Sequence, residues 1–507
     1  MVRRSLGWAA GEQYLRLAIG FASIAAVSRL LTPTEIGVSV IGTGIVLIAL
    51  SLREFATSDY LIRREQIAGD DVRTSFTVLF LLTALITSVM FILAPWFGAL
   101  YGEEKLARFI RVGAVAGLIE AVSLPIKGLL RREMAFGTLA LINAVSAIVT
   151  ALVTVLLALV GFSYMSVAWA CVAAATTTTL LSLYFRPEIW IFRPALSSWR
   201  NILEFGGYNG ASHCINRTYE ALPQLVLGNM LPHSAVGLYN RANVTAGIPD
   251  QIVLTSVVAV AFPAFAAEVR NGRSVKEPYL QALSLITVLY WPALVLLALL
   301  AHPVVLILLG DQWLAMVPLL QVISIAALAW FAVALASPVL LALGATRDRM
   351  LADLVGRSGA AIGLCSAAYL AVAHFGVMAM AASQLVNLPL QMLVAFWFVR
   401  RHIAFHWHEI PSVLWKSAVV TATSAAGPLL LVALSDFSFA LPIPTAMLAA
   451  LLASLGWVAG VLATGHPVSA ELRNASSRAC EASGLLARLG RPLHPGVVHG
   501  PKPGEAD

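Results

Sequence analysis

Charged and amide side chains recur at one-turn spacing inside long apolar stretches of this sequence. The clearest case lies between residues 202 and 230, where four polar residues occur at i, i+3, i+4 and i+7 and would share one helix face. They are His213, Asn216, Arg217 and Glu220. Similar sets occur elsewhere: Glu12 with Arg16, Asp353 with Arg357, and Gln384 with Asn387 and Gln391. Arg241 stands without a nearby acid.

The chemistry that these residue types suit is the binding of a polar, anionic head group. A guanidinium keeps its charge and binds phosphate oxygens through two N–H groups. We therefore predict phosphate contacts for Arg16, Arg217, Arg241 and Arg357. Acids at such positions could bind a coupling H⁺ or Na⁺, and the remaining polar residues would line the same cavity. The acids are Glu12, Glu220 and Asp353. The other polar residues are His213, Asn216, Gln384, Asn387 and Gln391.

The alternative is that these residues form structural ion pairs that neutralise one another. It applies to Glu12/Arg16, Arg53/Glu54, Arg217/Glu220 and Asp353/Arg357. A charge that faces lipid costs at least ~2.5 to 3.5 kcal/mol, so either a wet cavity or a close partner is required. We expect no metal site, because the cysteines lack metal-ligand spacing. His402, His406 and His408 are more typical of an interfacial basic loop.

The composition indicates which elements carry these side chains. Hydrophobic residues make up 59% of the 507 and charged residues only 12%, which excludes a water-soluble enzyme. Apolar runs of roughly 20 residues predict an all-α polytopic membrane protein with about 14 transmembrane helices. The spans are Trp8–Leu30, Ile36–Ala56, Ser75–Pro95, Leu106–Ile126, Thr138–Val160, Met165–Phe185, Ile202–Met230, Val236–Phe262, Tyr279–Leu300, Pro318–Leu343, Leu351–His374, Val377–Val399, Lys416–Leu434 and Leu441–Ala463.

Loop charge predicts the sidedness of these spans. Lys and Arg concentrate in alternate loops, which places both termini in the cytoplasm. The net charge of +7 thereby needs no nucleic-acid partner. Residues 465–507 are expected to form a largely disordered cytoplasmic tail. The loops on the other face are short and hold few acids, so no external catalytic domain is predicted.

An internal repeat predicts how the spans are arranged. Leu31–Gly37 after the first span resembles Leu231–Gly237 after the seventh. Pro95 and Gly102 are likewise separated as Pro303 and Gly310 are. Because six spans make one unit, the two copies share one orientation. We predict an N-lobe over residues 1–200, a C-lobe over 201–400, two extra helices over 401–464, and a central cavity between the lobes.

Several segments resemble the Wzx-type polysaccharide flippases of the multidrug, oligosaccharidyl-lipid and polysaccharide exporter superfamily. The segments are Gln224–Gly228, Val236–Ala242, Ala261–Phe265, Ser28–Gly37, Leu309–Gln321 and Arg131–Phe136. The resemblance covers about residues 5 to 400 as a dispersed pattern. Pro223 departs from it, because the family usually has an Asp there, and the role of that acid is in doubt for this chain.

The resemblance implies a secondary transporter without enzyme activity or a resident cofactor. Its cargo would be an undecaprenyl-pyrophosphate-linked oligosaccharide, flipped to the periplasmic leaflet by alternating access for exopolysaccharide, capsule or O-antigen synthesis. Membrane lipids are expected partners, and a polysaccharide polymerase or export complex is a candidate partner. The alternatives are a peptidoglycan-precursor flippase, a drug or cation antiporter, a membrane glycosyltransferase or polymerase, and a scaffold for polysaccharide assembly. The sequence lacks a phosphate-binding GxxxxGK[ST] motif, so an ion gradient or substrate supply would drive transport.

Overall fold

The computed structural model describes residues 2–53, 69–197, 199–359, 371–372 and 374–469. Within these residues the secondary structure is helical, with no strand. The longer helices are α1 (Val2–Leu30), α2 (Pro33–Ser51), α4 (Gly69–Leu100), α5 (Glu104–Arg132), α6 (Phe136–Leu159), α7 (Met165–Phe185), α8 (Trp199–Met230), α9 (His233–Ala246), α10 (Thr255–Arg270), α11 (Lys276–Leu299), α13 (Val317–Ala326), α14 (Trp330–Ala342), α17 (Val377–Arg400), α18 (Glu409–Leu434) and α19 (Ile443–Thr464). The short helices are α12 (Ala301–Leu308), α15 (Thr346–Asp353) and the 3₁₀ segment η4 (Asp311–Met316).

Eleven described helical segments are long and apolar enough to cross a membrane. They correspond to eleven of the fourteen predicted spans. The first and seventh predicted spans are helical, as α1 and α8, but are not among these eleven. The eleventh predicted span runs through residues 360–370 and 373, which lie outside the described residues. The membrane-spanning all-α class is thus confirmed, and the total of fourteen stays a prediction, as do the boundaries of the predicted lobes.

Local sequence explains where α2 begins and where the eighth predicted span is interrupted. At the start of α2 the Thr32 side chain accepts a hydrogen bond from the Glu35 N–H, and Glu35 accepts one from the Thr32 N–H, which is a capping box. The span predicted as continuous from Val236 to Phe262 ends as α9 at Ala246 and resumes as α10 after a π-helical turn, Asp250–Leu254. The break follows Gly247 and Pro249, which both disfavour a continuous α-helix.

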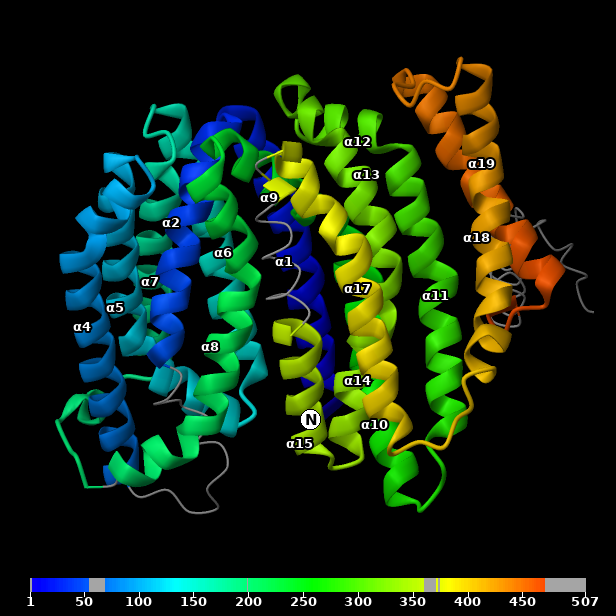
Figure 1. The fold of residues 1–507 in the computed structure, drawn as a ribbon. Coiled ribbons are helices and arrows are strands. Elements are labelled where there is room, and N and C mark those ends of the chain that lie inside the picture. Colours follow the sequence, from blue (N-terminus) through cyan, green and yellow to red (C-terminus); the bar gives the residue numbers. More distant parts are fainter. Residues whose placement is uncertain (1, 54–68, 198, 360–370, 373, 470–507) are drawn as a thin grey trace, which may run out of the picture.

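The helices run in broadly similar directions, with α4 and α5 at one edge and α18 and α19 at the other (Figure 1). We use N-lobe for α1 to α7 and C-lobe for α8 to α17. In the N-lobe, α5 packs on α4 and α7, and α6 packs on α7 and α1. In the C-lobe, α17 packs on α13 and α14. Helices α18 and α19 pack on each other, and α18 packs along α11.

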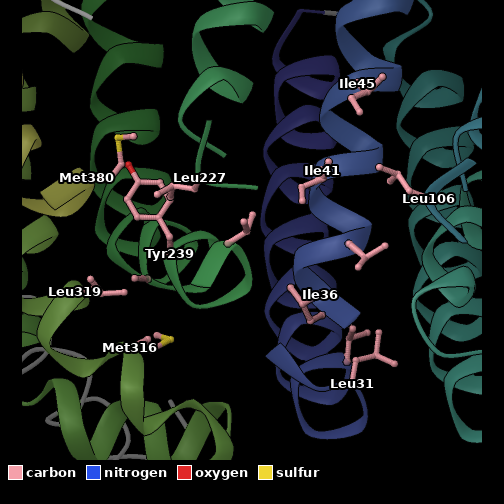
Figure 2. Close-up of a cluster of buried hydrophobic side chains, with 14 of the residues drawn as sticks. Leu31, Ile36, Ile41, Ile45, Leu106, Leu227, Tyr239, Met316, Leu319 and Met380 are labelled. Carbon is pink, nitrogen blue, oxygen red and sulfur yellow. The ribbon is translucent and has the colours of Figure 1, made fainter. Parts of the chain in front are cut away.

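The largest apolar core joins the two lobes. Ile36, Ile41 and Ile45 on α2 and Tyr239 on α9 are buried in one cluster (Figure 2). The same cluster includes Met316 and other side chains from η4 and α13. Burial of apolar area stabilises contacts in lipid mainly through close packing, because lipid tails are themselves apolar.

Candidate binding cavity between the two lobes

A cavity of about 340 Å³ lies where α2 of the N-lobe faces α8 and α9 of the C-lobe. Its apolar side is formed mainly by α2, and its polar side by the two C-lobe helices. The polar lining residues are Ser39, Thr43, Arg217, Glu220, Gln224, Asn240 and Arg241. Three of the predicted site residues, Arg217, Glu220 and Arg241, therefore meet in one inter-lobe cavity.

Arg217 and Glu220 form an ion pair along α8. Arg217 Nη1 donates to Glu220 Oε2 at 2.9 Å, as the i, i+3 spacing allows. Their side chains are 50% and 54% exposed, so both remain accessible within the cavity. An accessible pair of this kind is weakly stabilising, which leaves the guanidinium available to exchange its partner for another anion.

Arg241 has no counterion among the described residues. The residue is only 9% exposed, yet it makes no hydrogen bond or ion pair with any described residue. Its guanidinium lies 5.8 Å from the centre of the Trp313 ring, a cation–π distance. A buried, unpaired guanidinium that lines a cavity is costly without an anion. This arrangement agrees with the sequence prediction that Arg241 lacks an acid partner.

Arg357 belongs to a neighbouring polar cluster in the C-lobe. Its Nη1 donates to Asn216 Oδ1 at 3.3 Å, and its Nε lies 3.7 Å from Asp353 Oδ1. The guanidinium also lies 5.7 Å from the centre of the Trp330 ring. The predicted one-turn pairing of Asp353 with Arg357 is therefore present, and Asn216 on α8 joins it across the helices.

The three amides of α17 form a network with tyrosines of α8 and α9. Asn387 Nδ2 and Gln391 Nε2 both donate to the Tyr219 hydroxyl, at 3.1 and 2.9 Å. Gln384 Nε2 donates to the Tyr239 hydroxyl at 2.7 Å and to Asn243 Oδ1 at 3.0 Å. A second cavity of about 250 Å³ lies over this network and shares Glu220 and Gln224 with the first. The two cavities are adjoining parts of one polar region.

Helices α2 and α9, which both line the inter-lobe cavity, cross in direct backbone contact. A Cβ on Gly37 would overlap the His233 carbonyl oxygen, and a Cβ on Gly237 would overlap the Pro33 carbonyl oxygen. Each such Cβ would also lie 3.2 Å from the backbone nitrogen of the other glycine. The contact is thus reciprocal, and only glycine permits this approach. The two copies of the repeated turn meet here, at the predicted external end.

Three of the remaining predicted residues either lie away from the two cavities or have side chains that are not described. His213 is exposed and lines neither of the two cavities. The side chains of Glu12 and Arg16 lie outside the described residues, although their backbone belongs to α1. Arg53 donates to Glu120 Oε2 at 2.6 Å, and Glu54 lies outside the described residues, so the alternative pairing of Arg53 with Glu54 stays a prediction.

Sequence reasoning did not single out Tyr219, Tyr239 or Asp250. Tyr219 continues the polar stripe of α8, three residues after Asn216, which is the signal that identifies it. Asp250 stands in the π-helical turn between α9 and α10, and its carboxylate forms no ion pair with a described residue. A π-turn that carries an acid inside a predicted span is a frequent mark of a functional position.

A family described as "Polysaccharide biosynthesis protein" matches residues 26–318, which is more than half of the chain. The lipopolysaccharide biosynthesis protein WzxC of Escherichia coli (strain K12) is 23% identical over 63% of this chain. The succinoglycan biosynthesis transport protein ExoT of Rhizobium meliloti (strain 1021) is 24% identical over 64% of it. Each match spans 66% of the relative's own length.

Solved structures share the fold. The lipid II flippase MurJ in an inward closed conformation aligns with a TM-score of 0.73 at 11% identity, covering 89% of this chain and 97% of MurJ. A multidrug resistance MATE transporter of the MOP superfamily, in an inward-facing conformation, aligns with a TM-score of 0.61 at 16% identity, covering 77% and 94%. With the eleven apolar helices, these likenesses show a multi-pass membrane protein with this transporter fold.

Proposed function

The chain belongs to the polysaccharide biosynthesis protein family, and from this premise we propose that it flips a lipid-linked oligosaccharide across the membrane. The cargo is an undecaprenyl-pyrophosphate-linked oligosaccharide that moves from the cytoplasmic to the periplasmic leaflet of a bacterial inner membrane. The protein acts as a secondary transporter by alternating access and has both termini in the cytoplasm. The names of the relatives, which refer to lipopolysaccharide biosynthesis and succinoglycan transport, support this proposal.

The observation that carries the proposal is the inter-lobe cavity lined by Arg217, Glu220 and Arg241, beside the close contact of α2 with α9. A diphosphate and many sugar hydroxyls cannot cross hydrocarbon unaided, because each unsatisfied polar group costs several kcal/mol there. The cavity supplies Arg217 and Arg241 for the phosphates. The lipid tail stays in the bilayer while the lobes exchange access from one side to the other.

The C-lobe network suits the sugar part of the cargo. Amides such as Gln384 and Asn387 both donate to and accept from hydroxyls, and Trp330 presents a ring that a sugar can stack on. Arg357, next to Trp330, is assigned as a further phosphate contact beside Arg217 and Arg241. Glu220 and Asp353 are the described candidates for a coupling H⁺ or Na⁺. In this mechanism no covalent bond forms or breaks.

Transport by the purified protein tests the proposal. The full chain is reconstituted in liposomes with a fluorescent undecaprenyl-diphosphate oligosaccharide, and access of the sugar to an external glycosidase is followed. We expect Arg241→Gln to lower the initial rate at least tenfold, since loss of a desolvated charge contact costs ~2 to 5 kcal/mol. Arg270→Gln serves as the matched control, because Arg270 is exposed at the end of α10 and outside both cavities.

Three outcomes decide between the proposal and its alternatives. Equal rates for wild type and the double variant Arg217→Gln/Arg241→Gln would remove the assigned role of the cavity. Faster flipping of an undecaprenyl-diphosphate muropeptide than of the oligosaccharide would favour a peptidoglycan precursor as cargo. Proton-driven efflux of a cationic dye, with no oligosaccharide flipping, would favour a drug antiporter.

A further inference from the structure

The N-lobe encloses a cavity of its own, of about 500 Å³, bounded by α2, α5, α6 and α7. It shares Thr43 and Leu47 with the inter-lobe cavity. The two spaces therefore adjoin along one face of α2. None of the residues predicted from the sequence to bind cargo lines this N-lobe cavity.

Helix α5 contributes a row of charges to this cavity. Glu120, Lys127 and Arg131 all line it and recur at i, i+7 and i+11, which places them on one helix face. Arg53, just after α2, donates to Glu120 Oε2 at 2.6 Å and to the Gly117 carbonyl oxygen at 3.2 Å. The only acid of the row is thus already neutralised by a fixed partner from another helix.

Glu120 is a single negative charge beside Arg53, Lys127 and Arg131, so this group of side chains carries an excess of positive charge. Neither side chain forms an ion pair with a described residue. Lys127 is half-buried and Arg131 is exposed, and both line the cavity. In a membrane-embedded cavity the field of two unpaired cations is screened less than in water, so the site favours an anion.

Hydroxyl and amide groups complete the lining. Thr178 Oγ1 donates to Ser146 Oγ at 3.0 Å, and Thr150 Oγ1 donates to the Ser146 carbonyl oxygen at 2.6 Å. Ser146, Thr150, Thr178 and Asn143 all line the cavity. The lining therefore suits a ligand that is both anionic and rich in hydroxyl groups.

We infer that the N-lobe cavity is an anion-binding subsite for the head group of the cargo, with Lys127 and Arg131 as its ligands. This inference rests on the proposed function. The anionic oxygens have two possible sources in such a cargo: the diphosphate of the lipid carrier, or a carboxylate on an acidic sugar. The cavity adjoins the inter-lobe site, so one head group can contact both.

The thiol of Cys171 allows a direct test, because this exposed residue lines the same cavity. In a Cys214→Ser/Cys365→Ser/Cys480→Ser background, the rate of Cys171 modification by a charged methanethiosulfonate is measured in detergent. Sodium pyrophosphate, glucuronate and glucose are the probes. We expect pyrophosphate, glucuronate or both to slow modification at least threefold, and glucose to have no effect. Protection of Cys171 by pyrophosphate would identify the diphosphate of the lipid carrier as the bound group, and protection by glucuronate would identify the carboxylate of an acidic sugar.

The charge requirement is tested in the same background. The double variant Lys127→Gln/Arg131→Gln should abolish protection. The protecting anion should also raise the thermal unfolding midpoint of this variant less than that of the wild type. Lys105→Gln is the matched control, because Lys105 is exposed on the first turn of the same helix and outside the cavity. No protection and no anion-dependent midpoint shift in the wild type would overturn the inference, as would equal protection in the double variant.

Failure of this inference and failure of the proposed function give different results. Binding of pyrophosphate or glucuronate is measured without transport. Protection that persists in a protein that flips no oligosaccharide would retain the subsite and reject the transport role. Loss of protection in Lys127→Gln/Arg131→Gln with unchanged flipping would retain the transport role and show that this anion site does not bind the head group of the cargo.

Discussion

At the scale of single residues, the three described arginines that were predicted to bind phosphate differ in whether an acid lies beside them. Arg217 and Arg357 each have an acid on their own helix, at 2.9 and 3.7 Å. Arg241 has only the face of Trp313. Because a lone buried guanidinium destabilises an empty cavity, Arg241 is the residue whose free energy improves most when a phosphate arrives.

The Tyr219 hydroxyl is predicted to hold the α8–α17 contact together. Tyr219→Phe leaves the amides of Asn387 and Gln391 without their shared acceptor. Unsatisfied buried donors cost ~1 to 3 kcal/mol, so the thermal unfolding midpoint of the purified protein should fall. Tyr184→Phe is the control, since Tyr184 is 79% exposed. An equal midpoint for Tyr219→Phe and wild type would show that the network adds nothing to stability.

Contacts within one helix could be predicted at this scale, and contacts between helices could not. The pairing of Arg217 with Glu220 follows from their spacing, as does the bond from Gln391 Nε2 to Asn387 Oδ1 at 3.1 Å. Tyr219 as the partner of the α17 amides and Glu120 as the partner of Arg53 were missed, because these bonds join residues far apart in the chain. Tertiary packing decides such pairs, and one sequence contains no period that reveals them.

At the scale of elements, the crossing of α2 and α9 depends on two glycines. Gly37 and Gly237 bring the helix backbones together without side chains between them. The contact is made by backbone atoms, which cannot rotate away as side chains do. A larger residue must therefore push the helices apart rather than repack.

Gly37→Ala is predicted to open this crossing. Its Cβ would overlap the His233 carbonyl oxygen, so the closed state should lose ~1.4 kcal/mol or more, a tenfold change in population. Ser39→Cys, in the cavity lining, should then react faster with a membrane-impermeant maleimide added from outside. Gly20→Ala is the control, because nothing lies within 4 Å of its Cβ position. Equal labelling in both variants would contradict a role of the crossing in closure.

The end of α19 is predicted to be held by a neutral histidine. His466 is fully buried, and its Nδ1 accepts from the Val468 N–H, so its Nε2–H donates to Ser284 Oγ at 2.7 Å. Burial and the nearby Lys416 ammonium hold the pKa of His466 below its ordinary value of 6.5. Below pH 6.5 His466 therefore binds a proton more readily in the unfolded chain than in the folded chain. The free energy of unfolding then decreases as the pH is lowered.

The measurement is the thermal unfolding midpoint between pH 7.5 and pH 5.5. The wild type should lose more stability across this range than His466→Gln, because glutamine can donate to Ser284 but does not titrate. Above pH 6.5 both proteins should be insensitive to pH at this position. An equal change of the unfolding midpoint with pH in the two proteins would show that protonation of His466 does not weaken the contact between the end of α19 and Ser284.

Helix positions were predictable to within several residues, and helix interruptions were not. The capping signal Thr32–Glu35 and the apolar runs placed α2 and most other helices correctly. The eighth predicted span is one of the eleven apolar helical segments, but the π-helical turn Asp250–Leu254 inside it was not predicted. Hydropathy, which averages over many residues, does not register a single irregular turn.

At the scale of the whole molecule, the two copies of the repeated turn contact each other, which the sequence analysis did not predict. Gly102 and Gly310, equivalent in the repeat, both adopt positive φ, at +64° and +99°. Gly37 and Gly237 then meet each other reciprocally, as two related helices on either side of an axis must. The cavities within the N-lobe and C-lobe were not predictable, because they depend on the packing of four or more helices.

Linking the lobes at their contacting end is predicted to stop transport. Arg29 of α1 donates to the Ile307 carbonyl oxygen of α12 at 2.5 Å, and both residues are exposed. A cleavable bis-methanethiosulfonate reagent should join Arg29→Cys to Ile307→Cys in a cysteine-free background. If alternating access requires this end to open, flipping should fall to background and recover when the link is cleaved.

A link that does not cross the lobes separates this effect from general damage. Lys276→Cys/Glu409→Cys is the matched pair, because these residues join α11 to α18 at 2.7 Å and stand away from the inter-lobe cavity. Linking them should leave the flipping rate within about twofold of the unlinked protein, since α11 and α18 should move as one body. Continued flipping with Arg29→Cys fully linked to Ile307→Cys would mean that cargo leaves without separation of α1 from α12, and the route would then have to run sideways through the bundle.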